Sequence, residues 1–249
     1  MRYFIVFSYF GKSYHGWQSQ PNAITIQAVL EDSISKLLGE NIAVVGAGRT
    51  DAGVHAKQMY AHFDFEGELA VDDFVFRLNA FLPDDIAVVG IHPVANDAHA
   101  RFDAIERTYE YWITQRKNPF YMDTAHYVRH ELDIDAMNKA AQLIRAHNDF
   151  ECFSKSNTEV RTFLCKIKKA EWTRHTDRLV FKITADRFLR NMVRAIVGTL
   201  LDVGIGKSNL EDVRIILKGK DRSLAGASVP AKGLYLTKIV YPDTIKGNE

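Results

Sequence analysis

The 249-residue chain has little cysteine and no long uninterrupted apolar run. Its two cysteines, Cys152 and Cys165, stand in none of the spacings used by metal sites, so they are most simply reduced thiols. The longest apolar stretch, residues 188–205, is interrupted by three charged side chains, Arg190, Arg194 and Asp202. This pattern predicts a buried helix and argues against a membrane span.

Two localisation and cofactor signatures are also missing. The apolar run Met1–Phe7 is too short and too aromatic for a signal peptide, so we expect a cytoplasmic protein. The pair Gly46 and Gly48 lacks the third glycine and the following helix of a dinucleotide-binding loop, which argues against a nucleotide cofactor.

Net charge is small, at +1, but the charges are segregated along the chain. Residues 155–194 contain eleven Lys and Arg against four acids, whereas residues 64–97 contain eight acids and one Arg. A protein of near-zero total charge can therefore present a basic face to phosphates. The alternative is that both stretches are ordinary solvated surfaces.

Residue periodicity predicts two similar halves. In residues 1–105 we expect strands at 2–9, 42–47, 58–65 and 86–92, and helices at 26–38 and 72–82. Thr25 is the expected N-cap of the first helix and Gly39 its terminator. The order βαββαβ is that of ferredoxin-like folds.

Residues 106–249 repeat this order. We expect strands at 107–113, 166–175, 178–185 and 233–241, and helices from Ile134 to Ile144 and at 188–203, with an added helix at 209–218 capped by Ser208 and Glu211. The prediction is an α+β protein of two related ferredoxin-like halves, with antiparallel sheets joined across a central cleft.

A glycine-rich loop, residues 46–56, carries the clearest chemistry in the chain. It follows the apolar run 42–45 and presents Asp51 two residues after Arg49. A carboxylate held beside a guanidinium stays ionised, so it can act as a nucleophile. The plainer alternative is an ion pair that only pins a turn.

The loop, Gly-Ala-Gly-Arg-Thr-Asp-Ala-Gly-Val-His-Ala, resembles the catalytic loop of the TruA family of tRNA pseudouridine synthases. The likeness extends along the chain through His15-Gly16-Trp17-Gln18, Leu82-Pro83-Asp84-Asp85-Ile86, Arg107-Thr108-Tyr109-Glu110-Tyr111, Arg190-Asn191-Met192-Val193-Arg194 and Gly233-Leu234-Tyr235-Leu236. The chain departs from the family at Arg187, where glycine is usual, at Gln58-Met59 and at Val229–Gly233. These departures affect expected RNA contacts and remove no reacting group.

The resemblance implies an isomerase that converts uridine to pseudouridine at positions 38, 39 and 40 in the anticodon stem-loop of tRNA. It implies Asp51 as nucleophile, attacking either C1′ of the sugar or C6 of the base. No cofactor and no metal are required, and a homodimer with tRNA as partner is expected.

The same resemblance suggests roles for other residues. Arg194 is expected to form the ion pair with Asp51, although Arg49 and Arg190 remain alternatives. Tyr109 and Leu236 would bind the flipped base, and Arg49 the phosphate or the displaced strand. Arg187, Arg190 and Arg194, spaced three and four residues apart, are expected to form a charged stripe along an otherwise apolar helix, the first two binding RNA.

Two other functions are alternatives to this one. A metal-dependent hydrolase would use Asp51, His55, His62 and Asp64, but their spacing matches no known zinc or two-metal signature. An RNA-binding or RNA-chaperone module without enzymatic activity would have no need of the Arg-Thr-Asp loop.

Overall fold

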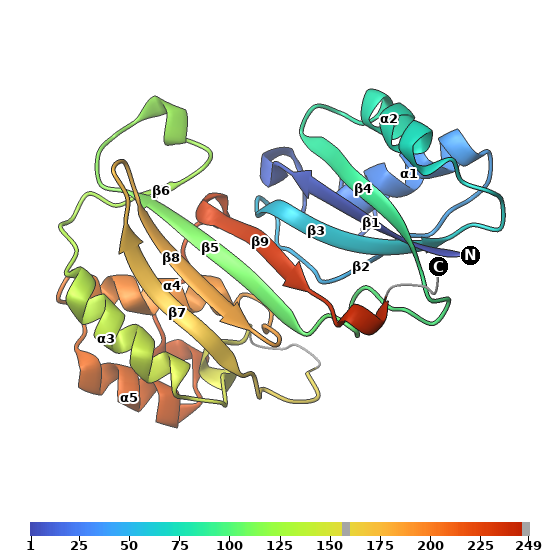
Figure 1. Ribbon diagram of the computed structural model, residues 1–249. Helices are drawn as coiled ribbons and strands as arrows, with labels where there is room; N and C mark the ends of the chain where they lie inside the picture. The colour runs from blue at the N-terminus through green and yellow to red at the C-terminus, as the bar shows by residue number, and fades with distance from the viewer. Residues whose placement is uncertain (156–159, 246–249) are drawn as a thin grey trace. The chain divides into compact units, whose positions relative to one another are not determined.

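The computed structural model describes residues 1–155 and 160–245 and divides into two compact units (Figure 1). Unit 1 consists of Met1–Ile105 and Leu236–Glu249, and unit 2 of Glu106–Tyr235. The expected α+β class is confirmed, since each unit combines helices with β-strands. Within the described ranges no helix is long and apolar enough to cross a membrane.

Unit 1 combines two helices with β-strands. Its strands are β1 (Arg2–Tyr9), β2 (Val45–Gly46), β3 (His55–Asp64) and β4 (Ile86–Val94), with most of β9 (Leu234–Val240). β1 lies between β4 and β3, and short β2 pairs with β3, each pair being antiparallel. α1 (Ile26–Leu38) packs against α2 (Val71–Phe81), which also packs on β4 (Figure 1).

The first helix is capped as its sequence predicts. Thr25 Oγ1 accepts a hydrogen bond from Ala28 N at 3.3 Å, and Gly39 ends the helix in the left-handed conformation at φ 77°. Ile26, Leu30 and Ile34 are fully buried. Caps at both ends and one apolar face thus fix α1 against the core.

Unit 2 contains the sheet order β5 (Glu106–Thr114), β8 (Leu179–Ala185) and β7 (Ile167–Arg174), with β6 (His126–Tyr127) paired parallel to β5. α3 (Ile134–Arg145) packs on β7, and α4 (Met192–Gly204) and α5 (Leu210–Gly219) pack on α3 (Figure 1). α4 is almost wholly buried, as its apolar sequence predicts.

Three sequence expectations are corrected. The strand expected at 42–47 is reduced to β2, Val45–Gly46. α4 begins at Met192, four residues later than expected, because Asn191 adopts a left-handed conformation at φ 67°, which a right-handed helix cannot include. The capping box of α5 is formed by Asn209 and Asp212, one residue after the expected pair, Ser208 and Glu211.

His62 on β3 is a buried histidine in unit 1, with 5% of its surface exposed. Its Nδ1 accepts a hydrogen bond from Ala100 N at 3.1 Å, so the fold holds the neutral ring. Burial lowers the pKa of His62 to about 4, an effect strengthened by nearby positive groups. The charges facing it come from Arg2 and His99, which lower its pKa, and from Asp64 and Asp103, which oppose them.

We predict an acid-sensitive stability that depends on His62. The folded pKa is about 4 and the ordinary value 6.5, so between these values the unfolded chain binds a proton that the folded chain rejects. The free energy of unfolding should therefore fall as the pH drops from 6.5 to 4, by up to about 3 kcal/mol from this residue. Urea unfolding at half-unit pH steps measures the slope.

The test variant is His62→Asn, whose amide oxygen can still accept the Ala100 hydrogen bond. Between pH 6.5 and 4, its free energy of unfolding should lose most of the pH dependence that the parent shows. His130→Asn, at an exposed histidine, is the control and should keep the parent slope. Equal slopes in the parent and His62→Asn would contradict the assignment.

Candidate functional site

The Arg49–Asp51 segment lies in the connection between β2 and β3 of unit 1. Asp51 is half-buried and Arg49 is exposed. The connection starts at a short strand paired to β3 and returns into β3 itself at His55. Both ends of the loop are therefore held by the same sheet.

Hydrogen bonds to the N-terminal segment of unit 1 fix the middle of this loop. Thr50 O accepts from Trp17 N at 3.2 Å, and Thr50 Oγ1 is 2.8 Å from the Tyr9 hydroxyl. Gly53 N donates to Tyr14 O at 3.3 Å. The residues on both sides of Asp51 are thus anchored, which limits the positions its carboxylate can take.

Two glycines allow this close approach. A Cβ on Gly46 would lie 2.4 Å from the indole of Trp17, which is 2% exposed. A Cβ on Gly16 would lie 2.4 Å from Thr50 O, and Gly16 also has φ +89°. The His15-Gly16-Trp17 segment, for which the sequence offered no role, is therefore the support on which the loop rests.

Tyr109 lies on β5 of unit 2. Its half-buried ring meets Phe188 edge to face, with the ring centroids 5.2 Å apart. Tyr111, two residues further along the strand, is fully buried and donates its hydroxyl to Pro230 O at 2.8 Å. Burial raises the pKa of Tyr111, while the positive charge of Arg194 opposes this shift.

Arg194 lies in the first turn of α4, where a cation is unfavourable for the helix dipole. Its Nε donates to Val229 O at 2.7 Å, and Val229 N donates to Arg194 O at 3.3 Å. Asn191, just before the helix, donates to Ser228 Oγ at 2.6 Å. The segment 228–230 therefore positions the arginine.

The sequence does not indicate this positioning role. Its one signal is the pattern Val229–Gly233, a departure from the family that predicts only altered RNA contacts. The structure gives its first two residues a structural function, since Val229 binds Arg194 and Pro230 accepts the Tyr111 hydroxyl.

The expected arginine stripe on one helix is wrong. Arg187 and Arg190 precede α4, which starts at Met192, so Arg194 alone of the three is helical. Arg187 is half-buried and its backbone N donates to Asp186 Oδ1 at 2.7 Å, whereas Arg190 is exposed. The remaining expected binding residue, Leu236, lies on β9 in unit 1 and is 2% exposed.

The residues of the metal-hydrolase hypothesis are engaged in other contacts. His55 Nδ1 accepts from Gly11 N at 2.9 Å, and the His55 ring stacks on Phe10. Asp64 binds the Arg2 guanidinium through both oxygens at 2.8 Å. No group of three His, Cys, Asp or Glu in the described part of the chain is arranged to hold a metal.

Comparison with known proteins agrees with these features. A tRNA pseudouridine synthase family model matches residues 5–103 and 140–242. A tRNA pseudouridine synthase A of Bacteroides fragilis is 51% identical over 246 residues, covering 98% of each chain. The protein of the same name from Parabacteroides distasonis is 49% identical over 98% of this chain and 97% of its own. A third, from Thermoanaerobacter sp., is 41% identical over 95% of this chain and 98% of its own. With the Arg-Thr-Asp loop held on its glycine support, these matches establish that the chain belongs to the TruA family of tRNA pseudouridine synthases.

Proposed function

We propose that this protein isomerises uridine to pseudouridine at positions 38, 39 and 40 in the anticodon stem-loop of tRNA, with Asp51 as nucleophile. The observation that carries the proposal is the anchored loop, which supports a half-buried carboxylate on both sides. The family membership supplies the reaction.

The chemistry needs one nucleophile and no external reactant. Asp51 forms a bond either to C1′ of the sugar or to C6 of the base, and the N1–C1′ bond breaks. The base turns, C5 bonds to C1′, the Asp51 bond breaks and C5 loses its proton while N1 gains one. No group is donated and no oxidation state changes, so the proposal includes no cofactor and no metal.

Arg194 is proposed as the partner that keeps Asp51 ionised. Its anchoring through Nε to Val229 O supports this role, because a guanidinium with one fixed edge can hold a carboxylate in a single orientation. Arg49, exposed on the loop, is then assigned to phosphate or to the displaced strand.

The other assignments concern the RNA. Tyr109 is proposed to stack on the flipped uracil, and its edge contact with Phe188 supports a fixed ring. Leu236 would close the base pocket. Arg187 and Arg190 are proposed to contact the RNA backbone.

We also propose how the chain is organised into domains. Residues 1–105 and 106–249 are two related ferredoxin-like halves whose sheets join across a central cleft. The strand order β4-β1-β3-β2 in unit 1 supports a ferredoxin-like arrangement of the first half. We also propose that the protein works as a cytoplasmic homodimer.

Asp51→Asn should abolish pseudouridine formation, lowering turnover by at least about 10³-fold, because an amide cannot act as the nucleophile. The tRNA affinity should stay within about twofold of the parent, since phosphate contacts are unchanged. Mapping pseudouridine in unmodified tRNA, together with a binding titration, measures both.

The control is Asp84→Asn, which makes the same change of charge at an exposed carboxylate of unit 1. It should retain parent activity. Pseudouridine formed by a verified Asp51→Asn preparation would overturn the nucleophile assignment, and an inactive parent protein would overturn the proposed reaction.

Arg194→Lys should lower kcat by roughly 10²-fold because lysine keeps the charge but lacks the planar fork that orients a carboxylate. Urea unfolding separates this effect from the loss of the Val229 hydrogen bond. Arg49→Lys and Arg190→Lys are measured alongside. If one of these loses more kcat than Arg194→Lys, that arginine is the partner of Asp51.

A further inference from the structure

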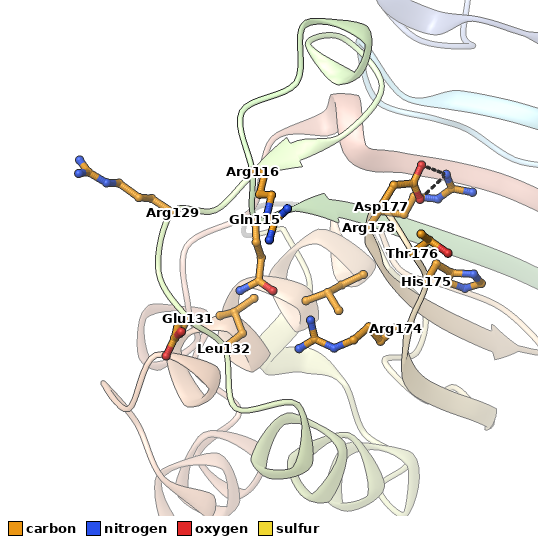
Figure 2. Close-up of a pocket in the computed structure, with 11 residues that line it drawn as sticks. Gln115, Arg116, Arg129, Glu131, Leu132, Arg174, His175, Thr176, Asp177 and Arg178 are labelled. Atoms are coloured by element: carbon orange, nitrogen blue, oxygen red, sulfur yellow. Dashed lines mark hydrogen bonds and ion pairs between the residues drawn. The ribbon is translucent and has the colours of Figure 1, made fainter.

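A basic pocket lies in unit 2, and none of the residues assigned above lines it. It has a volume of about 660 Å³ and is formed by the end of β5, the segment before α3 and the β7–β8 hairpin (Figure 2). Its side chains are those of Gln115, Arg116, Arg129, Glu131, Leu132, Arg174, His175, Thr176, Asp177, Arg178 and Leu179. A volume in this range accommodates a nucleotide-sized group.

Positive charge dominates the lining, with four arginines against two carboxylates. Asp177 is already engaged, because it pairs with Arg178 at 3.3 Å (Figure 2). It also accepts a hydrogen bond from the Tyr121 hydroxyl. Arg178 in turn stacks over the Trp112 ring at 4.2 Å. Asp177, the acid closest in sequence to Arg174 and Arg178 of the hairpin, therefore neutralises Arg178.

The remaining arginines, Arg116, Arg129 and Arg174, differ from the other cations of this sheet. Among the described residues none of the three forms a salt bridge, although Lys168 pairs with Glu106 and Lys169 with Glu171. All three are exposed, and in Figure 2 the Arg129 side chain extends outward from the rim. Their charge is thus available to an anionic ligand.

The pocket lies at a distance from the proposed base-binding residue. Tyr109 lies five residues before the end of β5 at Thr114, and at ~3.3 Å per residue along the strand this corresponds to about 16 Å. A ligand bound here cannot be the reacting uridine held at Tyr109. It can be another part of the same RNA.

We propose that this pocket binds a backbone phosphate of the tRNA several nucleotides from the modified uridine. The inference rests on the proposed function, since the RNA substrate supplies the anion. Arg116 and Arg174 contact the phosphate, with Arg129 at the rim, and this contact adds affinity without taking part in the reaction.

The test is the double variant Arg116→Gln/Arg174→Gln. Its KM for tRNA should rise about tenfold with kcat within twofold, and the slope of log affinity against log salt should become shallower by about one to two. The control is Arg145→Gln/Arg214→Gln, which removes the same charge from exposed positions on α3 and α5. It should leave both quantities near the parent values.

Equal losses in the two double variants would overturn the pocket and leave only a general charge effect. A second arm titrates the parent with inorganic phosphate and uridine monophosphate. Binding that vanishes in Arg116→Gln/Arg174→Gln while tRNA affinity is unchanged would identify a small-anion site and overturn the RNA assignment. A parent protein that forms no pseudouridine would instead count against the proposed function.

A second inference concerns Gly48, beside the reactive segment. A Cβ at Gly46 would collide with Trp17, but a Cβ at Gly48 would meet nothing within 4 Å, and Gly48 does not have a φ in the left-handed region. Unit 1 therefore does not require glycine at this position. We infer that the open space at Gly48 admits the RNA strand, which passes closely over the backbone before Asp51.

A side-chain series tests this inference on the proposed reaction. Gly48→Ala, Gly48→Ser and Gly48→Val should all fold with the parent midpoint in urea, while kcat/KM falls progressively with side-chain size, to roughly 10²-fold for valine. If Gly48→Ala and Gly48→Val lower kcat/KM equally, the position needs the backbone freedom of glycine, and the RNA does not approach it closely. Full activity of Gly48→Val overturns the inference, and an inactive parent overturns the proposed reaction separately.

Discussion

The reactive loop depends on one packing constraint, the contact of Gly46 and Thr50 with the segment Gly16-Trp17. A buried indole against a bare backbone leaves no room for adjustment, since a Cβ at Gly46 would lie 2.4 Å from the ring. A carboxylate on an unanchored loop would lose orientation at each encounter with substrate. The main-chain hydrogen bonds of Trp17 and Gly53 remove that freedom before substrate arrives, as the nucleophilic role proposed for Asp51 requires.

Unit 2 fixes its arginine by a different means. Arg194 is placed against the dipole at the start of a buried helix, and Val229 offsets this cost by accepting from its Nε. Asn191, in the left-handed conformation, comes just before the first helical residue, Met192. Its side chain donates to Ser228 Oγ, so the surrounding structure supports this conformation beside the arginine that we propose as the partner of Asp51.

The sequence predicted what depends on local patterns. Thr25, Gly39 and the spacing of apolar residues predict helix α1 with its caps. The residues of the glycine-rich loop, 46–56, by themselves predict a loop at that place. It could not predict what depends on distant contacts. Asn191, left-handed just before α4, is bonded to Ser228, 37 residues away, and the loop is supported by Trp17. Nor does any local signal give the bulge in β7 after Ile167, which leaves Lys168 and Lys169 both exposed.

The structure also changes the meaning of the charge pattern. Counting residues 155–194 suggests a broadly basic surface, but Lys168 and Lys169 are paired with acids and Lys182 lies 4.0 Å from Glu110. Residues 156–159 of that stretch, which include Glu159, lie outside the described part. An ion pair presents little field to a phosphate because its charges cancel within a Debye length. The phosphate contact that we propose in unit 2 is therefore assigned to arginines that form no salt bridge among the described residues, Arg116, Arg129 and Arg174. For such groups, position in the fold matters more than the total charge of a segment.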